Sequence, residues 1–239
     1  MSELSKYFTN AFSHSYKSKT PDEYVFQRGD YRFSVLSSRI IRVEKDEKRI
    51  FTDEATQTVI CRDFDRPQFG FSQDNNKIVI KTDDIIFRFD LSKGKAESIT
   101  LKDSRCVTNF KAGNLKGTYR TLDMINGSVR LGDGLMSTNG VSVVDDSKTV
   151  IVSTDGTLKE RRHIQKDEYY FAFGNDFRGC LKDFFKLCGS VPLVPRYCLG
   201  NWWSRYKDYS QQEYIDLMKK FLERDIPISV ATIDMDWHW

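Results

Sequence analysis

The chain has 239 residues, enough for one large domain or two small ones with a hydrophobic core. Hydrophobic residues make up 39% and aromatic residues 13%, which excludes a disordered protein. The 37 Lys and Arg nearly balance the 34 Asp and Glu, for a net charge of +3, so no nucleic-acid partner is expected. The one dense basic run, Lys159–His163, lacks interleaved aromatic residues and is typical of a solvated loop or strand edge.

The cysteines are odd in number and scattered along the chain: Cys61, Cys106, Cys180, Cys188 and Cys198. Without a Cys-x-x-Cys spacing, they argue against both a disulfide framework and a zinc site. No apolar run is long enough for a signal peptide or a membrane span. We therefore expect a cytoplasmic protein without a membrane partner.

From Tyr24 to about Val152, apolar and polar residues alternate as they do in β-strands. A turn is expected at Gly29–Asp30. Strands are expected at Lys77–Lys81 and Ile85–Leu91, and a turn at Ser92–Lys95 leads into a third strand. Short strands at this spacing, with few helical stretches between them, predict an antiparallel β-sandwich.

Near residue 175 the interval between successive apolar residues changes from two positions to three or four. The stretch "NDFRGCLKDFFKLCG" predicts one amphipathic helix that Gly189 terminates. Its expected apolar stripe consists of Phe177, Cys180, Leu181, Phe184, Phe185 and Cys188. The linker "SVPLVPR" follows and indicates a domain boundary at about residue 195. This gives a sandwich domain with a C-terminal linking helix at residues 1–194 and a second domain at residues 195–239.

The second domain has a different pattern. "YCLGNWW" is typical of a short strand, and Ser210 with Glu213 forms a capping box that opens a helix running to about Arg224. The apolar face of this helix is expected to be Tyr214, Leu217, Met218 and Phe221. "IPISVATID" then predicts a strand that is covered on both faces. Strand, helix and strand within about 40 residues make a βαβ unit, typical of an α/β domain.

The last eight residues, "TIDMDWHW", place two carboxylates, a histidine and two tryptophans at the tip of this strand. In a β/α barrel the reacting groups sit at the C-terminal ends of the strands, which suits Asp234 as a site residue. Three interpretations compete. Carboxylates beside tryptophans suit a sugar, Asp-x-Asp-x-His suits a metal, and the same residues also occur as ordinary packing and capping groups.

The metal interpretation is the weaker of the two functional ones. Asp234, Asp236 and His238 would share one side of an extended strand. The other two histidines, His14 and His163, are isolated in the sequence, so no further histidine-rich segment completes a site. We expect no metal and no other cofactor.

A family resemblance favours the sugar interpretation. The stretch from "PLVPRYCLGNWWSRYKDYSQ" to "IPISVATIDMDWHW" resembles the start of the catalytic barrel in glycoside hydrolase family 31, which contains α-glucosidases and α-xylosidases. "GTYRTLDMINGSVRLGDGLMSTNGVSVVDDS" is similar to the end of the N-terminal sandwich in one branch of that family. Thr138 and Val141 depart from that branch, where Arg and Trp are expected. "YYFAFGNDFRGCLKDFFKLCG" resembles the helix that joins sandwich to barrel.

The resemblance implies a mainly β protein. An antiparallel, galactose-mutarotase-like β-sandwich would precede the first βαβ unit of a truncated (β/α)8 barrel. It also implies a retaining, exo-acting α-glycosidase in carbohydrate metabolism, with an oligosaccharide or α-glycoside as its partner. Both catalytic carboxylates of the family lie on later strands, so no catalytic residue is expected here, and a chain of this length is expected to be inactive.

By resemblance, Asp234 would bind a sugar hydroxyl, and Met235 would line the same pocket. Asn201, Trp202 and Trp203 would lie near it, with one tryptophan as a possible wall, and Asp236 would lie in the loop that follows. The alternative is a sandwich that binds carbohydrate or acts as a scaffold without catalysis, with the loop Asp133–Ser137 reaching a substrate entrance. The sequence leaves the preferred sugar, the linkage and the oligomeric state open.

Overall fold

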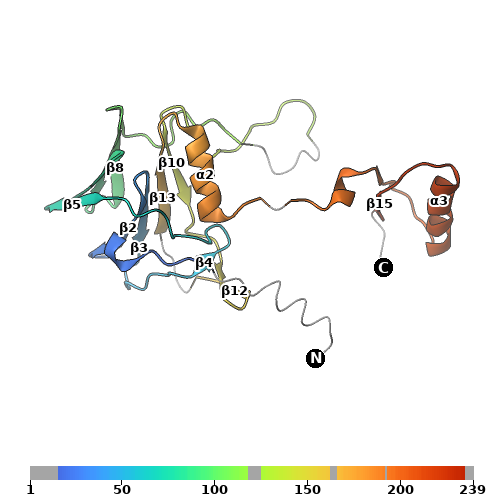
Figure 1. The fold of residues 1–239 in the computed structure, drawn as a ribbon, viewed down its shortest axis with the longest axis horizontal. Helices are drawn as coiled ribbons and strands as arrows, with labels where there is room; N and C mark the ends of the chain where they lie inside the picture. Colours follow the sequence, from blue (N-terminus) through green and yellow to red (C-terminus); the bar gives the residue numbers. More distant parts are fainter. Residues whose placement is uncertain (1–15, 118–124, 162–165, 192, 235–239) are drawn as a thin grey trace. The chain divides into compact units, whose positions relative to one another are not determined.

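A computed structural model describes residues 16–117, 125–161, 166–191 and 193–234 (Figure 1). The chain divides into two compact units, Met1–Ser190 and Val191–Trp239, so the division falls within the linker segment that the sequence marks as a boundary. Each unit is described by itself below.

The first unit is built on two five-stranded antiparallel sheets, both visible in Figure 1. The first sheet has the order β1 (Val25–Arg28), β2 (Tyr31–Ser37), β3 (Ile40–Lys45), β13 (Lys166–Ala172) and β10 (Val141–Asp145). The second has the order β5 (Phe69–Asp74), β6 (Lys77–Thr82), β7 (Ile85–Asp90), β8 (Lys95–Leu101) and β9 (Cys106–Val107). The predicted antiparallel sandwich is confirmed.

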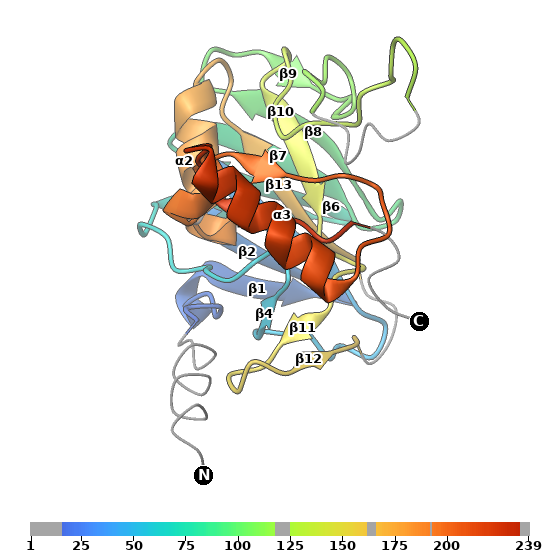
Figure 2. The same ribbon diagram turned by 90° about the vertical axis from the view of Figure 1, so that its right-hand side faces the viewer.

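Smaller elements complete the described part of this unit. A single 3-10 turn, η1 (Asp22–Tyr24), precedes β1. A three-stranded sheet of β12 (Leu158–Lys159), β11 (Ile151–Val152) and β4 (Ala55–Thr56) lies below β1 and β2 in the view of Figure 2.

The hairpin turns follow the predicted turn residues. Gly29 and Asp30 join β1 to β2, and Gly29 has a φ of +58° that favours glycine. Gly94 lies between β7 and β8 at a φ of +62°, and a Cβ there would come within 2.5 Å of the Tyr31 hydroxyl. A side chain at residue 94 would therefore disturb both the turn and the first sheet.

The two sheets enclose a core of aromatic and β-branched side chains. Phe33 and Ile41 of the first sheet and Phe87 and Phe89 of the second are fully buried. The rings of Phe33 and Phe89 meet edge to face, with centroids 5.2 Å apart. Alternation along each strand sends these side chains into the sandwich, as the sequence pattern predicts.

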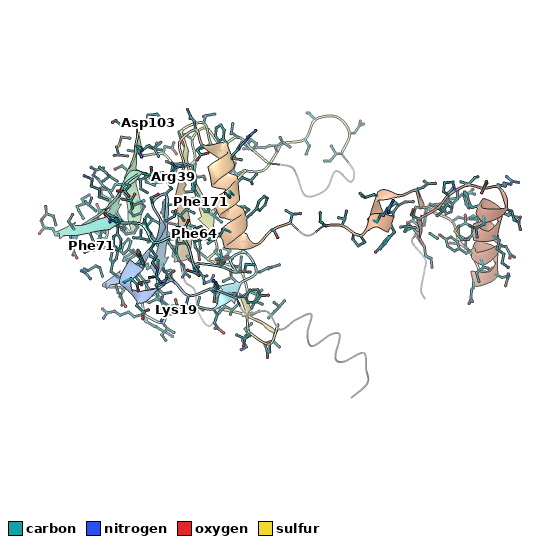
Figure 3. All side chains as sticks on the ribbon, in the orientation of Figure 1. Lys19, Arg39, Phe64, Phe71, Asp103 and Phe171 are labelled. Carbon is teal, nitrogen blue, oxygen red and sulfur yellow. The ribbon has the colours of Figure 1, made fainter. Side chains whose placement is uncertain are left out.

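The outer face of the first sheet has an apolar end covered by helix α2 (Phe177–Cys188). Phe64 and Phe171 lie in the cluster under this helix (Figure 3). Asp176 caps the helix by accepting a hydrogen bond from the Gly179 amide at 3.0 Å, and Gly189 follows the last residue at a φ of +89°.

The predicted stripe of this helix is only partly correct. Cys180 is buried, and Phe184 and Cys188 pack against the core. Phe177, Leu181 and Phe185, which lie at successive i, i+4 positions, are instead 36–39% exposed, whereas Leu187, outside the predicted stripe, is fully buried. The apolar face of the helix is wider than the part that contacts the sheet. The spacing of apolar residues alone therefore did not show which side of that face is buried.

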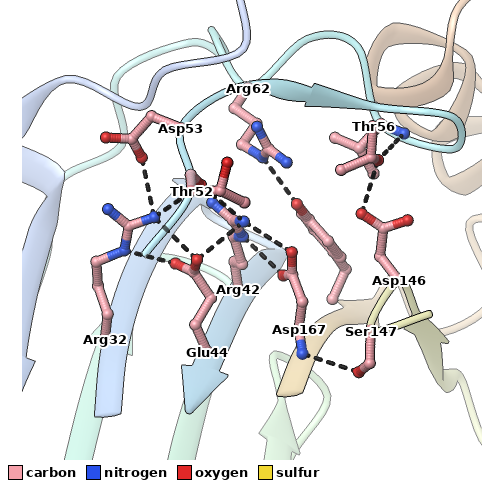
Figure 4. Close-up of polar contacts among 12 residues, drawn as sticks. Arg32, Arg42, Glu44, Thr52, Asp53, Thr56, Arg62, Asp146, Ser147 and Asp167 are labelled. Carbon is pink, nitrogen blue, oxygen red and sulfur yellow. Dashed lines mark hydrogen bonds and ion pairs between the residues drawn. The ribbon is translucent and has the colours of Figure 1, made fainter. Parts of the chain in front are cut away.

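The other end of this outer face is ionic (Figure 4). The Arg42 guanidinium donates to both carboxylate oxygens of Asp167 at 2.8 and 2.7 Å and lies 3.0 Å from Glu44, and all three side chains are buried. Arg32 donates to Glu44 at 2.6 and 2.9 Å. These four residues, which we call the ionic cluster, stand on β2, β3 and β13.

A covering segment, residues 50–64, closes over the ionic cluster. The Thr52 carbonyl accepts from Arg32 at 3.1 Å and from Arg42 at 3.4 Å. The fully buried Arg62 donates to the Tyr169 hydroxyl at 2.8 Å and to the Ser18 and Glu54 carbonyls. The charged side chains thus fix this segment over the ionic end of the sheet.

Burial and charge shift pKa values within the cluster in opposite directions. Burial disfavours the ionised form of Asp167, but Arg42 outweighs it and lowers the pKa of Asp167 to about 2. Burial raises the pKa of Glu44, although Arg42 and Arg32 partly offset it. Burial also opposes the charge of Arg42, whose pKa is nevertheless raised by Asp167 and Glu44.

The basic run at residue 159 contributes to this region. Lys159 lies on the edge strand β12, as expected. Arg161, however, is not a solvated residue: its side chain is only 7% exposed and its guanidinium lies 3.2 Å from Asp146 and 3.4 Å from Asp167. The acids it meets lie outside the run, 15 and 6 positions away, so the run itself gave no signal of them. Arg162 and His163, like His14, lie outside the described residues.

The second unit contains a βαβ unit, as predicted. A 3-10 turn η2 (Arg196–Leu199) precedes β14 (Trp202–Trp203), α3 (Gln211–Glu223) follows, and β15 (Val230–Ala231) pairs with β14 in parallel. Ser210 and Glu213 form the predicted capping box. Tyr214, Leu217, Met218 and Phe221 are the half-buried residues of the helix, so the predicted face is confirmed.

Both predicted strands of this unit are shorter than expected. In "YCLGNWW" only the two tryptophans form a strand, because Pro195 opens a 3-10 turn ahead of them. In "IPISVATID" only Val230 and Ala231 pair, and the described residues of this stretch are half-buried or exposed rather than covered on both faces. Within the described unit each strand has one neighbour, so burial on both faces is not reached.

Candidate functional site

The C-terminal ends of β14 and β15 bring two polar side chains together. Trp202 pairs with Val230 and Trp203 with Ala231, and the Thr232 amide donates to the Trp203 carbonyl at 2.9 Å. Ser204 directly follows β14, and Asp234 lies three residues beyond β15. The Ser204 hydroxyl donates a hydrogen bond to Asp234 Oδ2 at 3.1 Å. The sequence predicted Asp234 at this tip, and the structure adds Ser204.

Helix α3 also supports the tip of β15. The Tyr214 hydroxyl donates to the Thr232 carbonyl at 2.6 Å, two residues before Asp234. The backbone that carries Asp234 is therefore held from β14 on one side and from the helix on the other.

The two tryptophans of β14 have different surroundings. The ring of Trp203 packs against Phe221 of α3, with centroids 4.9 Å apart. Trp202 is 52% exposed, and its indole N–H donates to the Cys198 carbonyl at 3.0 Å. Successive residues of a strand face opposite ways, so Trp203 lies in the helix-covered layer and Trp202 has the accessible indole.

Asn201 lies at the other end of the strand. Its side chain donates to the Pro227 carbonyl at 3.0 Å, and its own carbonyl accepts from the Ser229 amide at 2.9 Å. It therefore joins the segments that lead into β14 and β15, at the end of β14 that is opposite Ser204. Its expected role in sugar binding stays a prediction.

Several residues expected at the site fall on the last part of the chain. Met235, Asp236, Trp237 and His238 lie outside the described residues, so the Asp-x-Asp-x-His metal hypothesis is not decided by the geometry. Among residues 16–117, 125–161, 166–191 and 193–234, no group of three or more His, Cys, Asp or Glu could hold a metal ion.

Two buried polar atoms near the site have no hydrogen-bond partner in the described part of the chain: the indole N–H of Trp203 and the hydroxyl of Thr232. Buried polar groups in proteins are almost always satisfied by protein or water. A carboxylate, hydroxyls and an accessible indole at one strand end suit a ligand that presents both hydroxyl groups and an apolar face.

The predicted contributor from the sandwich, the loop Asp133–Ser137, is held firmly at its base. Asn114 accepts from the Gly134 amide at 2.8 Å and donates to the Gly134 carbonyl at 2.9 Å, and Lys116 forms an ion pair with Asp133. This geometry fits an ordered turn. Its contact with a substrate entrance stays a prediction.

Comparison with known proteins places the second unit in a family. Residues 191–239 match the TIM-barrel domain of the glycosyl hydrolases of family 31. The alpha-xylosidase of Saccharolobus solfataricus is 36% identical over 75 residues, which cover 31% of this chain and 10% of that protein. Alpha-glucosidase 2 of Bacillus thermoamyloliquefaciens is 33% identical over 70 residues, which cover 29% of this chain and 9% of that protein.

The fold of the chain is also found in solved structures. A family 31 α-xylosidase from a soil metagenome, solved with xylose, superposes with a TM-score of 0.57 at 13% identity. The superposition covers 90% of this chain and 40% of that protein. At this identity the match establishes the fold alone.

The class that these findings define is a β-sandwich protein with a second unit that matches the TIM-barrel domain of family 31 glycosyl hydrolases. The match at residues 191–239 agrees with the resemblance to glycoside hydrolase family 31 that the sequence predicted. It matches about a tenth of the length of each curated relative. No helix among the described residues is long and apolar enough to cross a membrane.

Proposed function

We infer that the protein is the N-terminal part of a retaining, exo-acting α-glycosidase that removes terminal α-linked glucose or xylose from oligosaccharides. The observation that carries this proposal is the pair of parallel strand ends at Ser204 and Asp234, inside the segment that matches the family 31 barrel. In barrel enzymes this end of the strands is where substrate binds.

In this proposal Asp234 accepts a hydrogen bond from a hydroxyl of the terminal sugar, and Trp202 offers its indole to the apolar face of the ring. By the resemblance, Met235 would line the same pocket and Asp236 would lie in the loop that follows. Asn201 and Trp203 support the strand from its opposite end and from the helix layer, which fits their contacts with Pro227 and Phe221.

Retention of configuration needs two carboxylates about 5–5.5 Å apart, one a nucleophile and one an acid/base. The resemblance assigns neither to this chain, so residues 1–239 alone are proposed to be inactive. The five cysteines are free, which fits a reducing compartment such as the cytoplasm.

A second candidate function is a carbohydrate-binding or scaffold module without catalysis. The observation that favours it is the sandwich itself, which has a complete buried core within residues 31–187. In that case the family assignment would describe ancestry rather than activity.

Hydrolysis of p-nitrophenyl α-D-glucoside and α-D-xyloside separates the two candidates. The assay compares the 239-residue chain with the full reading frame that contains it. Activity in the full reading frame alone supports the α-glycosidase, and the preferred substrate identifies the sugar. Absence of activity in both, with retained affinity for an oligosaccharide, supports the binding module.

A further inference from the structure

Ser204 is a residue to which the family resemblance assigned no role. It follows β14 directly and is 30 positions away from Asp234 in sequence, yet its hydroxyl donates to Asp234 Oδ2 at 3.1 Å. A serine hydroxyl has one proton to donate, and here a carboxylate receives it. Hydrogen bonds to an ionised acceptor are stronger than those between neutral groups.

The backbone and the side chain of Asp234 are held by separate contacts. The backbone is fixed up to Thr232 by the bond from its amide to Trp203 and by the bond from Tyr214 to its carbonyl. Neither contact reaches the carboxylate, which turns about two torsion angles of its own. The bond from Ser204 acts on these angles and restrains the orientation of the carboxylate.

We propose that Ser204 is a positioning residue for substrate: it orients the Asp234 carboxylate toward a hydroxyl of the terminal sugar of an α-glycoside. This inference rests on the proposed function of the strand ends. The carboxylate has about four positions for accepting hydrogen bonds, and the bond from Ser204 uses one of them. A sugar hydroxyl then meets a carboxylate already in place, which lowers the ordering cost of binding.

The test uses the full reading frame with Ser204→Ala and Ser204→Thr. Alanine removes the donor and threonine keeps it. We expect Ser204→Ala to weaken both kcat/KM and the affinity for D-glucose or D-xylose about tenfold, which is typical for loss of one charge-assisted hydrogen bond. Ser204→Thr is expected to stay within about threefold of the wild type.

A double-mutant cycle tests whether Ser204 acts on substrate binding through Asp234. In an Asp234→Ala background, Ser204→Ala should cause no further loss, because the acceptor of its hydrogen bond is already gone. Tyr206→Phe is the matched control, because Tyr206 lies two residues away, is 64% exposed and has no hydrogen bond among the described residues. An additive loss in the double variant, or an equal loss in Tyr206→Phe, would overturn the positioning role.

Crystal structures of the wild type and of Ser204→Ala separate this inference from the proposed function. The torsion angles of Asp234 can be read whether or not the protein cleaves a glycoside. Unchanged torsion angles in Ser204→Ala overturn the positioning role even in an active enzyme. Changed torsion angles in a protein that neither binds nor cleaves either sugar support the positioning contact and overturn the α-glycosidase.

Discussion

The two units of the chain are stabilised in different ways. The first encloses side chains of zero exposure, among them Phe33, Phe87 and Tyr169. In the second, no described residue is buried, and Leu199, Leu222 and Ile233 are 66–77% exposed. The sandwich therefore has its own hydrophobic core, whereas the second unit depends on a short ladder, a capping box and a few ring contacts.

This difference shows which secondary-structure elements local sequence signals can specify in the absence of a hydrophobic core. The capping box at Ser210 and the apolar face of α3 form as predicted although nothing in the described unit is fully buried. A two-stranded parallel sheet, in contrast, leaves both edges and one face without neighbours, which is why β14 and β15 shorten to two residues each.

The largest effect on stability should come from the ionic cluster in the first unit. Arg42→Met leaves Asp167 and Glu44 buried without their shared cation, so the free energy of unfolding should fall by about 3–5 kcal/mol. Urea denaturation of the 239-residue chain measures it. Arg105→Met, which removes a partly exposed ion pair with Asp103, should cost less than about 1 kcal/mol. Equal losses in the two variants would mean that the cluster does not fix the covering segment.

Helix α2 allows the core of the first unit to be tested with two matched leucines. Leu187 is fully buried and Leu181 is 39% exposed. Leu187→Ala should lower the free energy of unfolding by about 2–4 kcal/mol, because it leaves a cavity, and Leu181→Ala by less than about 1 kcal/mol. Denaturation midpoints of both variants check this, and a larger loss at Leu181 would contradict the observed helix face.

Acid should weaken the first unit through Asp167. Its folded pKa of about 2 lies below the ordinary value, so its stabilising contribution is complete above about pH 4 and is lost as pH falls toward 2. The contribution is roughly 2–3 kcal/mol. The raised pKa of Glu44 acts in the opposite direction, since it favours proton uptake by the folded state.

The contribution of Asp167 is isolated by comparing how steeply the unfolding free energy changes with pH in two proteins. Unfolding free energies are measured between pH 4 and pH 2 for the wild type and for Asp167→Asn. The wild type should lose more stability over this interval than the variant, which starts from a lower value. Parallel curves would show that the pKa of Asp167 is not lowered in the folded protein.

The smallest expected effect is local to the second unit. Ser210→Ala removes the capping hydrogen bonds of α3 and should destabilise the helix by about 1 kcal/mol. Hydrogen exchange should accelerate in Gln211–Glu223 and stay unchanged in the strands of the sandwich. Gln211→Ala, an exposed helix position, is the control and should leave both rates unchanged. Faster exchange in the sandwich would mean that the two units unfold together.

Features that depend on near neighbours in the sequence were predictable. The turn at Gly29–Asp30, the alternation in β6 and β7 and the capping box all follow from residues within a few positions. The ionic cluster could not be predicted, because Arg42 and Asp167 are 125 positions apart and each resembles an ordinary polar residue of a strand. The burial of Arg161 was not predicted either, because its partners Asp146 and Asp167 lie outside the basic run.

The candidate site likewise contains features that could be predicted from the sequence and features that could not. Asp234 could be placed from the change of apolar to polar residues at a strand end. The contact with Ser204 could not, since it depends on the register of two strands separated by a helix. The different surroundings of Trp202 and Trp203 follow from strand alternation, but choosing which one faces the helix required the position of Phe221.

The most direct test compares kcat/KM of the full reading frame with that of Asp234→Ala, on whichever p-nitrophenyl α-glycoside the protein cleaves. Asp208→Ala, an exposed acid of the same unit, is the control. Asp234→Ala should lower kcat/KM about a hundredfold or more, because a charged contact to substrate is lost, and Asp208→Ala should leave it unchanged. Wild-type kcat/KM in Asp234→Ala would contradict a sugar-binding site at the ends of β14 and β15.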